Sequence, residues 1–205
     1  MNGKPLALTL GDPSGIGPEI SVEAWKAVGR ELPVLLVGDA DHVRRTARRD
    51  GIEVVAVDHP SRACEICDSA LPVWHVPLKT EAIPGRAEPA NAASVIGFIE
   101  TAVELTLKGQ AAAIVTNPVS KQVLHAGASF AYPGHTEFLA ALGGSKRGVM
   151  MLAAPGLRAV PATIHIPLAD VPRVLTPQLL SETIRITAAA LRSDFGVAAP
   201  RLAVA

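Results

Sequence analysis

Short apolar runs alternate with helix-forming segments from the start of the chain, and this alternation limits the possible folds more than any other feature. Strands are expected at residues 6–10, 34–37 and 53–57, and helices at residues 18–30 and 40–50. Such short, continuously apolar runs are typical of strands that are buried on both faces of a sheet. Because crossovers between such strands are right-handed, the pattern predicts an α/β fold with a parallel sheet.

The alternation is interrupted once and then resumes. Residues 59–89 contain five prolines and a single strand candidate at residues 73–76, which predicts an irregular excursion. The elements expected after it are a helix at 90–108, a buried strand at 112–115, a short helix ending at Ala126, strands near 149–153 and 159–163, and a long helix from Pro177 that is capped by Thr176 and closed by Gly196. We expect a first α/β domain over residues 1–127 and the front part of a second over residues 128–205.

Charge and hydropathy exclude several classes of protein. Nineteen basic and nineteen acidic residues balance in a chain of 205 residues, so no basic surface for nucleic acid or anionic lipid is expected. No apolar run approaches the roughly 20 residues of a membrane span, and the N-terminus lacks the features of a signal peptide. The sequence therefore predicts a cytoplasmic protein with a small-molecule ligand and no membrane or nucleic-acid partner.

The two cysteines, Cys64 and Cys67, form an isolated C-x-x-C pair. A structural zinc site needs about four ligands, and a thioredoxin-type pair needs a strand-to-helix junction that this segment does not supply. We expect two reduced, chemically inert thiols.

The segment GDPSGIGPE, at residues 11–19, joins the first strand to the first helix. Its three glycines allow close approach of a ligand, and the following helix N-terminus favours an anion, but the spacing matches neither the Rossmann nor the P-loop motif. A tight structural turn explains the glycines equally well. Asp12 could face a ligand or stabilise the turn, and Asp39 could bind a ribose or cap the second helix.

Two histidines lie where strand and helix patterns break off, which is where open α/β sheets bind ligands. His135 and Thr136, in YPGHTEF, offer an imidazole and a hydroxyl to a substrate, although Thr136 could simply cap a helix that starts at Glu137. His165, in ATIHIPL, has the setting of a metal ligand but also that of a hydrogen-bonded core histidine. Lys121, in TNPVSK, could contact a phosphate or be a solvated helix charge.

Five motifs occur in a fixed order: GDPSGIGPE, TNPVSK, YPGHTEFLAAL, VMML and ATIHIPLADV. Together they resemble the 4-hydroxythreonine-4-phosphate dehydrogenase family of pyridoxal phosphate biosynthesis, and the resemblance covers essentially the whole chain. It implies an isocitrate/isopropylmalate dehydrogenase-like fold, with two α/β/α domains and a cleft between them, that is incomplete in this chain.

The resemblance also implies an activity. Members oxidise 4-phosphohydroxy-L-threonine with NAD, assisted by a divalent metal (Zn, Mg or Co), and the product loses carbon dioxide; the enzyme is a homodimer. The histidine and threonine of the GHT motif contact substrate, which here are His135 and Thr136. The histidine of the THxPL-like motif is a metal ligand, which here is His165.

The resemblance places the other metal histidines, the basic phosphate contacts and most cofactor contacts after the segment at residues 201–205. We therefore expect these 205 residues to be inactive by themselves. Two alternatives stay open. One is a related dehydrogenase of threonate or erythronate 4-phosphate, or of a cyclic dihydrodiol dicarboxylate; the other is a truncated, non-catalytic binding or assembly module.

Overall fold

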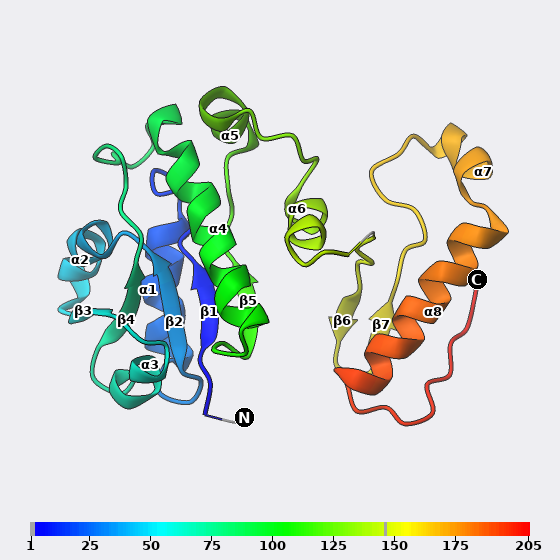
Figure 1. The fold of residues 1–205 in the computed structure, drawn as a ribbon, viewed down its shortest axis with the longest axis horizontal. Helices are drawn as coiled ribbons and strands as arrows, with labels where there is room; N and C mark the ends of the chain where they lie inside the picture. Colours follow the sequence, from blue (N-terminus) through cyan, green and yellow to red (C-terminus); the bar gives the residue numbers. More distant parts are fainter. Residues whose placement is uncertain (1–2, 146) are drawn as a thin grey trace. The chain divides into compact units, whose positions relative to one another are not determined.

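The computed structural model describes residues 3–145 and 147–205. The chain divides into two compact units, Met1–Gly134 and His135–Ala205. In chain order the first unit contains β1 (Leu6–Thr9), α1 (Gly17–Val28), β2 (Val34–Gly38), α2 (Ala40–Ala47), η1 (Arg48–Asp50), β3 (Val54–Val57), α3 (Ser61–Ile66), β4 (Leu71–His75), η2 (Pro89–Asn91), α4 (Ala92–Leu107), β5 (Ala113–Thr116) and α5 (Lys121–Ala128) (Figure 1).

The five strands form one parallel sheet in the order β3-β4-β2-β1-β5, as the alternating pattern predicts. Strand β2 is central and buried along its whole length, and β1 is nearly so. The crossovers through α1 and α2 run along the sheet towards β3, whereas those through α3 and α4 run towards β5. Because right-handed crossovers in opposite directions place their helices on opposite faces, α1 and α2 cover one face of the sheet and α3 and α4 cover the other. Helix α4 packs on β1, β2 and β5 (Figure 1).

Predicted helix ends are confirmed by their capping groups. Asp39 accepts a hydrogen bond from the backbone N–H of His42 at 2.8 Å and so caps α2. Gly51 ends η1 in the left-handed conformation, at φ 65°. In the second unit, the Thr176 hydroxyl accepts from the N–H of Leu179 at 3.1 Å, and Gly196 follows α8 at φ 66°.

Two features of the first unit differ from prediction. The segment that contains the cysteines is not a loop, because Ser61–Ile66 form helix α3 directly after Pro60. Strand β5 is not buried on both faces, since it lies at the edge of the described sheet and Val115 is 46% exposed. The sequence pattern does not distinguish an edge strand from a central one when both are apolar.

The second unit contains α6 (His135–Leu142), β6 (Leu152–Ala154), β7 (Leu157–Ala159), η3 (Leu168–Asp170), α7 (Val171–Val174) and α8 (Pro177–Ser193). The two strands expected near residues 149–153 and 159–163 are shorter and closer together than predicted. They form an antiparallel hairpin in which all six residues are exposed. Gly156, at φ 79° after Pro155, supplies the tight turn that allows this pairing.

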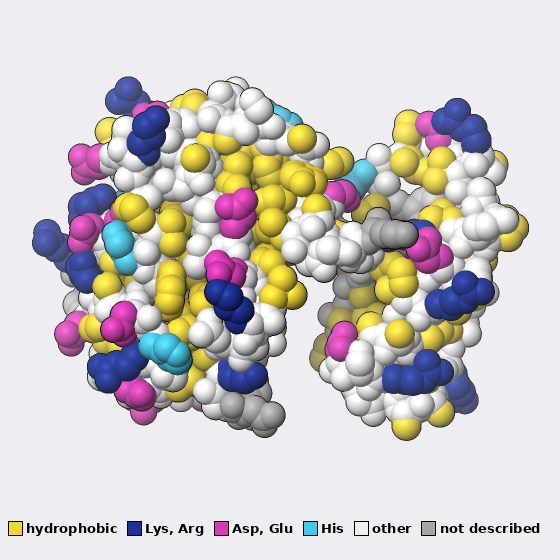
Figure 2. Space-filling view, in the orientation of Figure 1, with side chains coloured by type: hydrophobic (Ala, Val, Ile, Leu, Met, Phe, Trp, Pro, Cys, Tyr) yellow, Lys and Arg dark blue, Asp and Glu magenta, His cyan; other side chains and the backbone are white. Residues whose placement is uncertain are grey.

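One stretch, Pro89–Leu107, is long and apolar enough to cross a membrane when judged by length and composition. In this structure it consists of η2 and α4, and the buried residues of α4 pack on the sheet. A core helix meets the same criteria. Figure 2 shows basic and acidic side chains interspersed over the visible face of the first unit, in keeping with the balanced composition.

Candidate functional site

The carboxyl ends of β1 and β5 form a topological switch point in the first unit. The two strands are neighbours in the sheet, yet the chain after β1 enters α1 on one face, whereas the chain after β5 enters α5, which packs against α4 on the other. Ligands of open α/β sheets bind outside strand ends of this kind. The glycine-rich segment at residues 11–17 and the TNPVSK segment therefore meet where a ligand site is expected.

Asn117 joins these two segments. Its side-chain Nδ2 donates to the Ser21 hydroxyl at 2.7 Å and to the Gly17 carbonyl at 3.2 Å. The backbone N–H of Asp12 donates to the Pro118 carbonyl at 2.9 Å. Asn117 is 7% exposed and Ser21 is fully buried, so water does not compete for these bonds. The sequence drew attention only to Lys121 in this motif, because a buried amide that bonds residues about 100 positions away leaves no local signal.

This arrangement predicts a measurable energetic coupling between Asn117 and Ser21. Asn117→Ala is expected to lower the free energy of unfolding by about 2 kcal/mol, because it leaves buried groups without their donor. Combined with Ser21→Ala, it should show a coupling energy of about 1 kcal/mol in urea unfolding. The matched control pairs Asn117→Ala with Ser193→Ala, whose hydroxyl is exposed on α8. Equal coupling in both pairs would contradict a direct Asn117–Ser21 contribution.

The glycine-rich segment is held by its own turn and by its neighbours. The Asp12 carboxylate accepts from the Ser14 N–H at 2.9 Å, and Gly11 adopts φ 73° with Pro118 directly against it. These contacts support a role for Asp12 and Gly11 in stabilising the turn. The Ser14 hydroxyl is buried and has no hydrogen-bond partner among the described residues, so it is a polar group of this segment that a bound anion would satisfy.

Asp39 is fully engaged in holding the chain together. One carboxylate oxygen caps α2, and the other accepts from the Leu78 N–H at 2.9 Å. Burial by itself would raise the pKa of Asp39, but the N–H groups of Leu78 and His42 outweigh it and lower the pKa below the usual 3.8. Capping, and not ribose binding, is the role that these contacts support. Lys121 is exposed at the start of α5, which is capped by Ser120.

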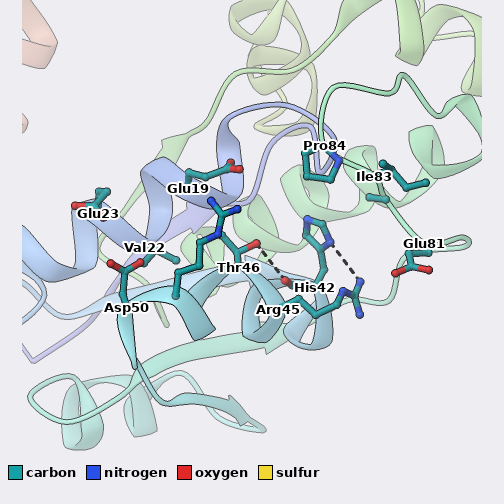
Figure 3. Close-up of a pocket in the computed structure, with 12 residues that line it drawn as sticks. Glu19, Val22, Glu23, His42, Arg45, Thr46, Asp50, Glu81, Ile83 and Pro84 are labelled. Atoms are coloured by element: carbon teal, nitrogen blue, oxygen red, sulfur yellow. Dashed lines mark hydrogen bonds between the residues drawn. The ribbon is translucent and has the colours of Figure 1, made fainter.

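A cavity of about 590 Å³ lies on the α1 and α2 side of the first unit (Figure 3). Its walls come from α1, from α2 with η1, and from residues 81–84. His42 lines the cavity from α2 and is 4% exposed, and its Nδ1 lies 3.4 Å from an Arg45 guanidinium nitrogen. Its Nε2 makes no hydrogen bond of good geometry within the described part of the chain.

The setting of His42 predicts a pH dependence of stability. Burial, and next the charge of Arg45, lower the pKa of His42, while the Pro13 carbonyl, Asp39 and Glu19 oppose them. The native state therefore takes up a proton here less readily than the unfolded chain, whose histidine titrates near 6.5. The free energy of unfolding should fall as the pH drops below that value, because the unfolded state then binds more protons, and should level off above it, where His42 is neutral in both states.

Urea unfolding on both sides of pH 6.5 checks this dependence. His42→Gln should make the free energy of unfolding less sensitive to pH across this interval, whereas His59→Gln, at an exposed histidine, should leave the sensitivity unchanged. A wild-type protein whose unfolding free energy is the same on both sides would show that His42 is not held neutral in the native state.

The predicted substrate residues lie in the second unit. Helix α6 begins at His135, two residues before the predicted start, so Thr136 lies inside the first turn and does not precede the helix. Both side chains are half-buried, and the Thr136 methyl group packs closely on Gly148.

His165 lies on a different segment of the same unit, between β7 and η3. It is exposed, and its φ of 57° is in the left-handed region, which is uncommon for a residue other than glycine. It is therefore not the hydrogen-bonded core histidine of the alternative interpretation. The described residues contain no group of three or more histidine, cysteine, aspartate or glutamate side chains placed to hold a metal. His165 is thus a single candidate ligand and not a complete site.

The two cysteines lie on and at the end of α3. The Cys64 thiol donates to the Gly3 carbonyl at 3.3 Å, and the Cys67 thiol to the Cys64 carbonyl at 3.6 Å. Burial raises the pKa of both thiols above the usual 9.0, and nearby acidic groups add to this effect. Thiols held in their neutral form are poor nucleophiles, which supports a structural role for the pair.

Comparison with known proteins assigns these features to a family. The sequence model described as pyridoxal phosphate biosynthetic protein PdxA matches residues 30–205. The chain belongs to this family. The 4-hydroxythreonine-4-phosphate dehydrogenase of Ruegeria sp. (strain TM1040) is 48% identical over 206 aligned positions, covering 100% of this chain and 62% of the relative. That of Roseobacter denitrificans is 47% identical over 98% of this chain and 60% of the relative.

Solved structures of PdxA family dehydrogenases match the fold as well. The 4-hydroxythreonine-4-phosphate dehydrogenase of Burkholderia phymatum aligns with a TM-score of 0.85 at 33% identity, over 97% of this chain and 61% of that one. A terephthalate 1,2-cis-dihydrodiol dehydrogenase from Burkholderia xenovorans LB400 aligns with a TM-score of 0.67 at 30% identity, over 96% and 59%. The chain spans about 60% of the length of the curated relatives that it matches.

Proposed function

We propose that the protein containing this chain is a cytoplasmic, homodimeric dehydrogenase that oxidises 4-phosphohydroxy-L-threonine with NAD, after which the product loses carbon dioxide. The observation that carries the proposal is the family match over residues 30–205, together with 48% identity to a 4-hydroxythreonine-4-phosphate dehydrogenase along the whole chain. The reaction supplies an intermediate of pyridoxal phosphate biosynthesis. The proposal concerns the whole protein, because this chain spans only part of its relatives.

His135 and Thr136 are proposed to bind the substrate. On consecutive residues in the first turn of α6, they present an imidazole and a hydroxyl next to each other. The hydroxyl donates or accepts a hydrogen bond, and the imidazole offers a donor at one nitrogen and an acceptor at the other. Together they can orient a substrate that carries both hydroxyl and carboxylate groups, and a fixed orientation is the main contribution of such residues to rate.

NAD, when bound, accepts the hydride from the substrate carbon. The residues at the switch point suit an anionic group of such a ligand, because the segment before α1 is clamped by Asn117 and includes the buried Ser14 hydroxyl without a partner in the described structure. We propose this segment as an anion-binding element. Its rigidity means that little ordering is required on binding.

His165 is proposed as one ligand of the divalent metal. An exposed imidazole can reach a metal, and must be neutral to do so. The described residues do not complete a site, since a catalytic metal has about three protein ligands. The proposal therefore requires further ligands from other residues of the protein, and no chemical step is assigned to the metal.

A related dehydrogenase activity is the second candidate. It is favoured by the likeness to the terephthalate 1,2-cis-dihydrodiol dehydrogenase, with a TM-score of 0.67. The higher identities to 4-hydroxythreonine-4-phosphate dehydrogenases support the first candidate over this one. NADH formation, measured with the whole protein and each of 4-phosphohydroxy-L-threonine, threonate 4-phosphate, erythronate 4-phosphate and a dihydrodiol dicarboxylate, tests the choice. The largest kcat/KM for any substrate other than the first would replace the proposal.

A non-catalytic binding module is the remaining alternative. It would require these 205 residues to unfold cooperatively as an independent protein. An expressed chain that aggregates or melts without a transition, while the longer protein unfolds cooperatively, would exclude it.

A further inference from the structure

The cavity between α1 and α2 has walls of opposite charge. One wall is formed by residues that recur at helical spacing on α2 and η1, namely His42, Arg45, Thr46 and Arg49. Another wall is formed by Glu19 and Glu23 of α1. Figure 3 shows Arg45 and His42 on α2, with Glu19 and Glu23 on α1 and Glu81 on the segment beyond. None of the residues assigned above to the proposed reaction lines the cavity, although the glycine-rich segment at residues 11–17 adjoins it.

Only part of this charge is neutralised within the protein. Lys26 forms ion pairs with Glu23 at 2.8 Å and with Asp50 at 3.0 Å, so these two carboxylates are compensated. Arg45 and Arg49 have no carboxylate within 4.0 Å among the described residues, and in the same part of the chain Glu19 and Glu81 have no basic group within that distance. Two guanidinium groups and two carboxylates therefore line one cavity without pairing.

The rest of the lining is apolar and fixed in place. Val22, Ile83 and Pro84 contribute apolar surface, and Ile83 is 50% exposed. The segment that carries Ile83 is tied to the glycine-rich segment, because the Gly85 N–H donates to the Ser14 carbonyl at 2.8 Å. A volume of about 590 Å³ is in the range of small-molecule sites.

The chemistry of these walls defines a ligand. Guanidinium groups one helical turn apart suit a phosphate, which accepts hydrogen bonds from both and carries close to two negative charges. The unpaired carboxylates suit an ammonium group, and the apolar lining suits a short carbon chain between the two. We infer that this cavity binds a small phosphorylated amine, with the phosphate on the Arg45 and Arg49 side and the ammonium group on one of the two unpaired carboxylates, Glu19 or Glu81.

Isothermal titration calorimetry on the whole protein tests the inference with phosphoethanolamine as the probe, and with inorganic phosphate and ethanolamine as its two halves. Phosphoethanolamine should bind at least about tenfold more tightly than either half, because both charged ends are engaged. Arg45→Ala with Arg49→Ala should weaken phosphoethanolamine binding by at least about tenfold. Glu19→Gln with Glu81→Gln should weaken it but should not weaken the binding of phosphate.

The controls separate this cavity from the proposed catalytic site. Arg30→Ala with Arg48→Ala removes the same charge outside the cavity lining and should preserve the affinity. His135→Ala, in the proposed substrate site, should also preserve it. No binding of phosphoethanolamine at millimolar concentration would overturn the inference, and so would binding that is lost in His135→Ala but kept in the Arg45/Arg49 double variant. All of the substituted arginines are exposed, so these variants are expected to fold. A thermal transition like that of the wild type would verify this.

Discussion

Gly17→Ala is expected to destabilise the protein by about 3 kcal/mol, which is the upper range for overpacking of a buried site. A methyl group at Gly17 would lie 2.1 Å from the Leu10 carbonyl oxygen and 3.2 Å from its carbon. These are backbone atoms of a fully buried residue, and the Leu10 N–H is itself bonded to the Val37 carbonyl at 3.0 Å. The Leu10 carbonyl group is therefore held in place and cannot easily move away from the added methyl group. Urea unfolding of the whole protein measures the effect.

Gly15→Ala is the matched control, since it makes the same change two residues away in the same loop. The nearest atoms to a methyl group there are Asp12 atoms at 3.4 Å, which is ordinary contact. We expect the free energy of unfolding to change by no more than about 0.5 kcal/mol. Equal destabilisation by the two substitutions would mean that the loop is equally intolerant of a side chain at either position. The close approach of Leu10 would then not be the reason that glycine is required at position 17.

His165→Ala should weaken the binding of the divalent metal by at least about tenfold, because it removes a direct ligand. His135→Ala should leave metal affinity nearly unchanged and raise KM for the substrate, since its proposed role is to hold substrate. Metal affinity is measured by competition with a chelator, and KM from initial rates of NADH formation. Unchanged metal affinity in His165→Ala would remove it from the proposed ligand set.

The elements with local signals could be predicted from the sequence. Continuous apolar runs marked β1, β2 and β3, and the caps at Asp39 and Thr176 marked helix starts. Helix α3 carried no such signal, because Pro60 precedes it and the cysteines resemble a metal or redox loop. The hairpin of β6 and β7 was misplaced for a related reason, since the apolar pattern continues beyond the Pro155–Gly156 turn that determines where the strands pair.

The candidate site shows the same division. The glycine-rich segment, TNPVSK and the two histidines stand out in the sequence by residue type, and the order of the motifs indicates the family. The bonds of Asn117 to Gly17 and Ser21, and the unpaired charges of the cavity between α1 and α2, depend on residues far apart in the sequence. Such contacts follow from the packing of elements and not from any one segment.

The most direct test of the proposed activity is a single assay of the whole protein, freed of metal and then supplied with 4-phosphohydroxy-L-threonine, NAD and a divalent metal. The account predicts NADH formation that requires all three additions, accompanied by release of carbon dioxide in equal amount. Absence of NADH under these conditions, in a protein that is folded and dimeric, would contradict the proposed reaction.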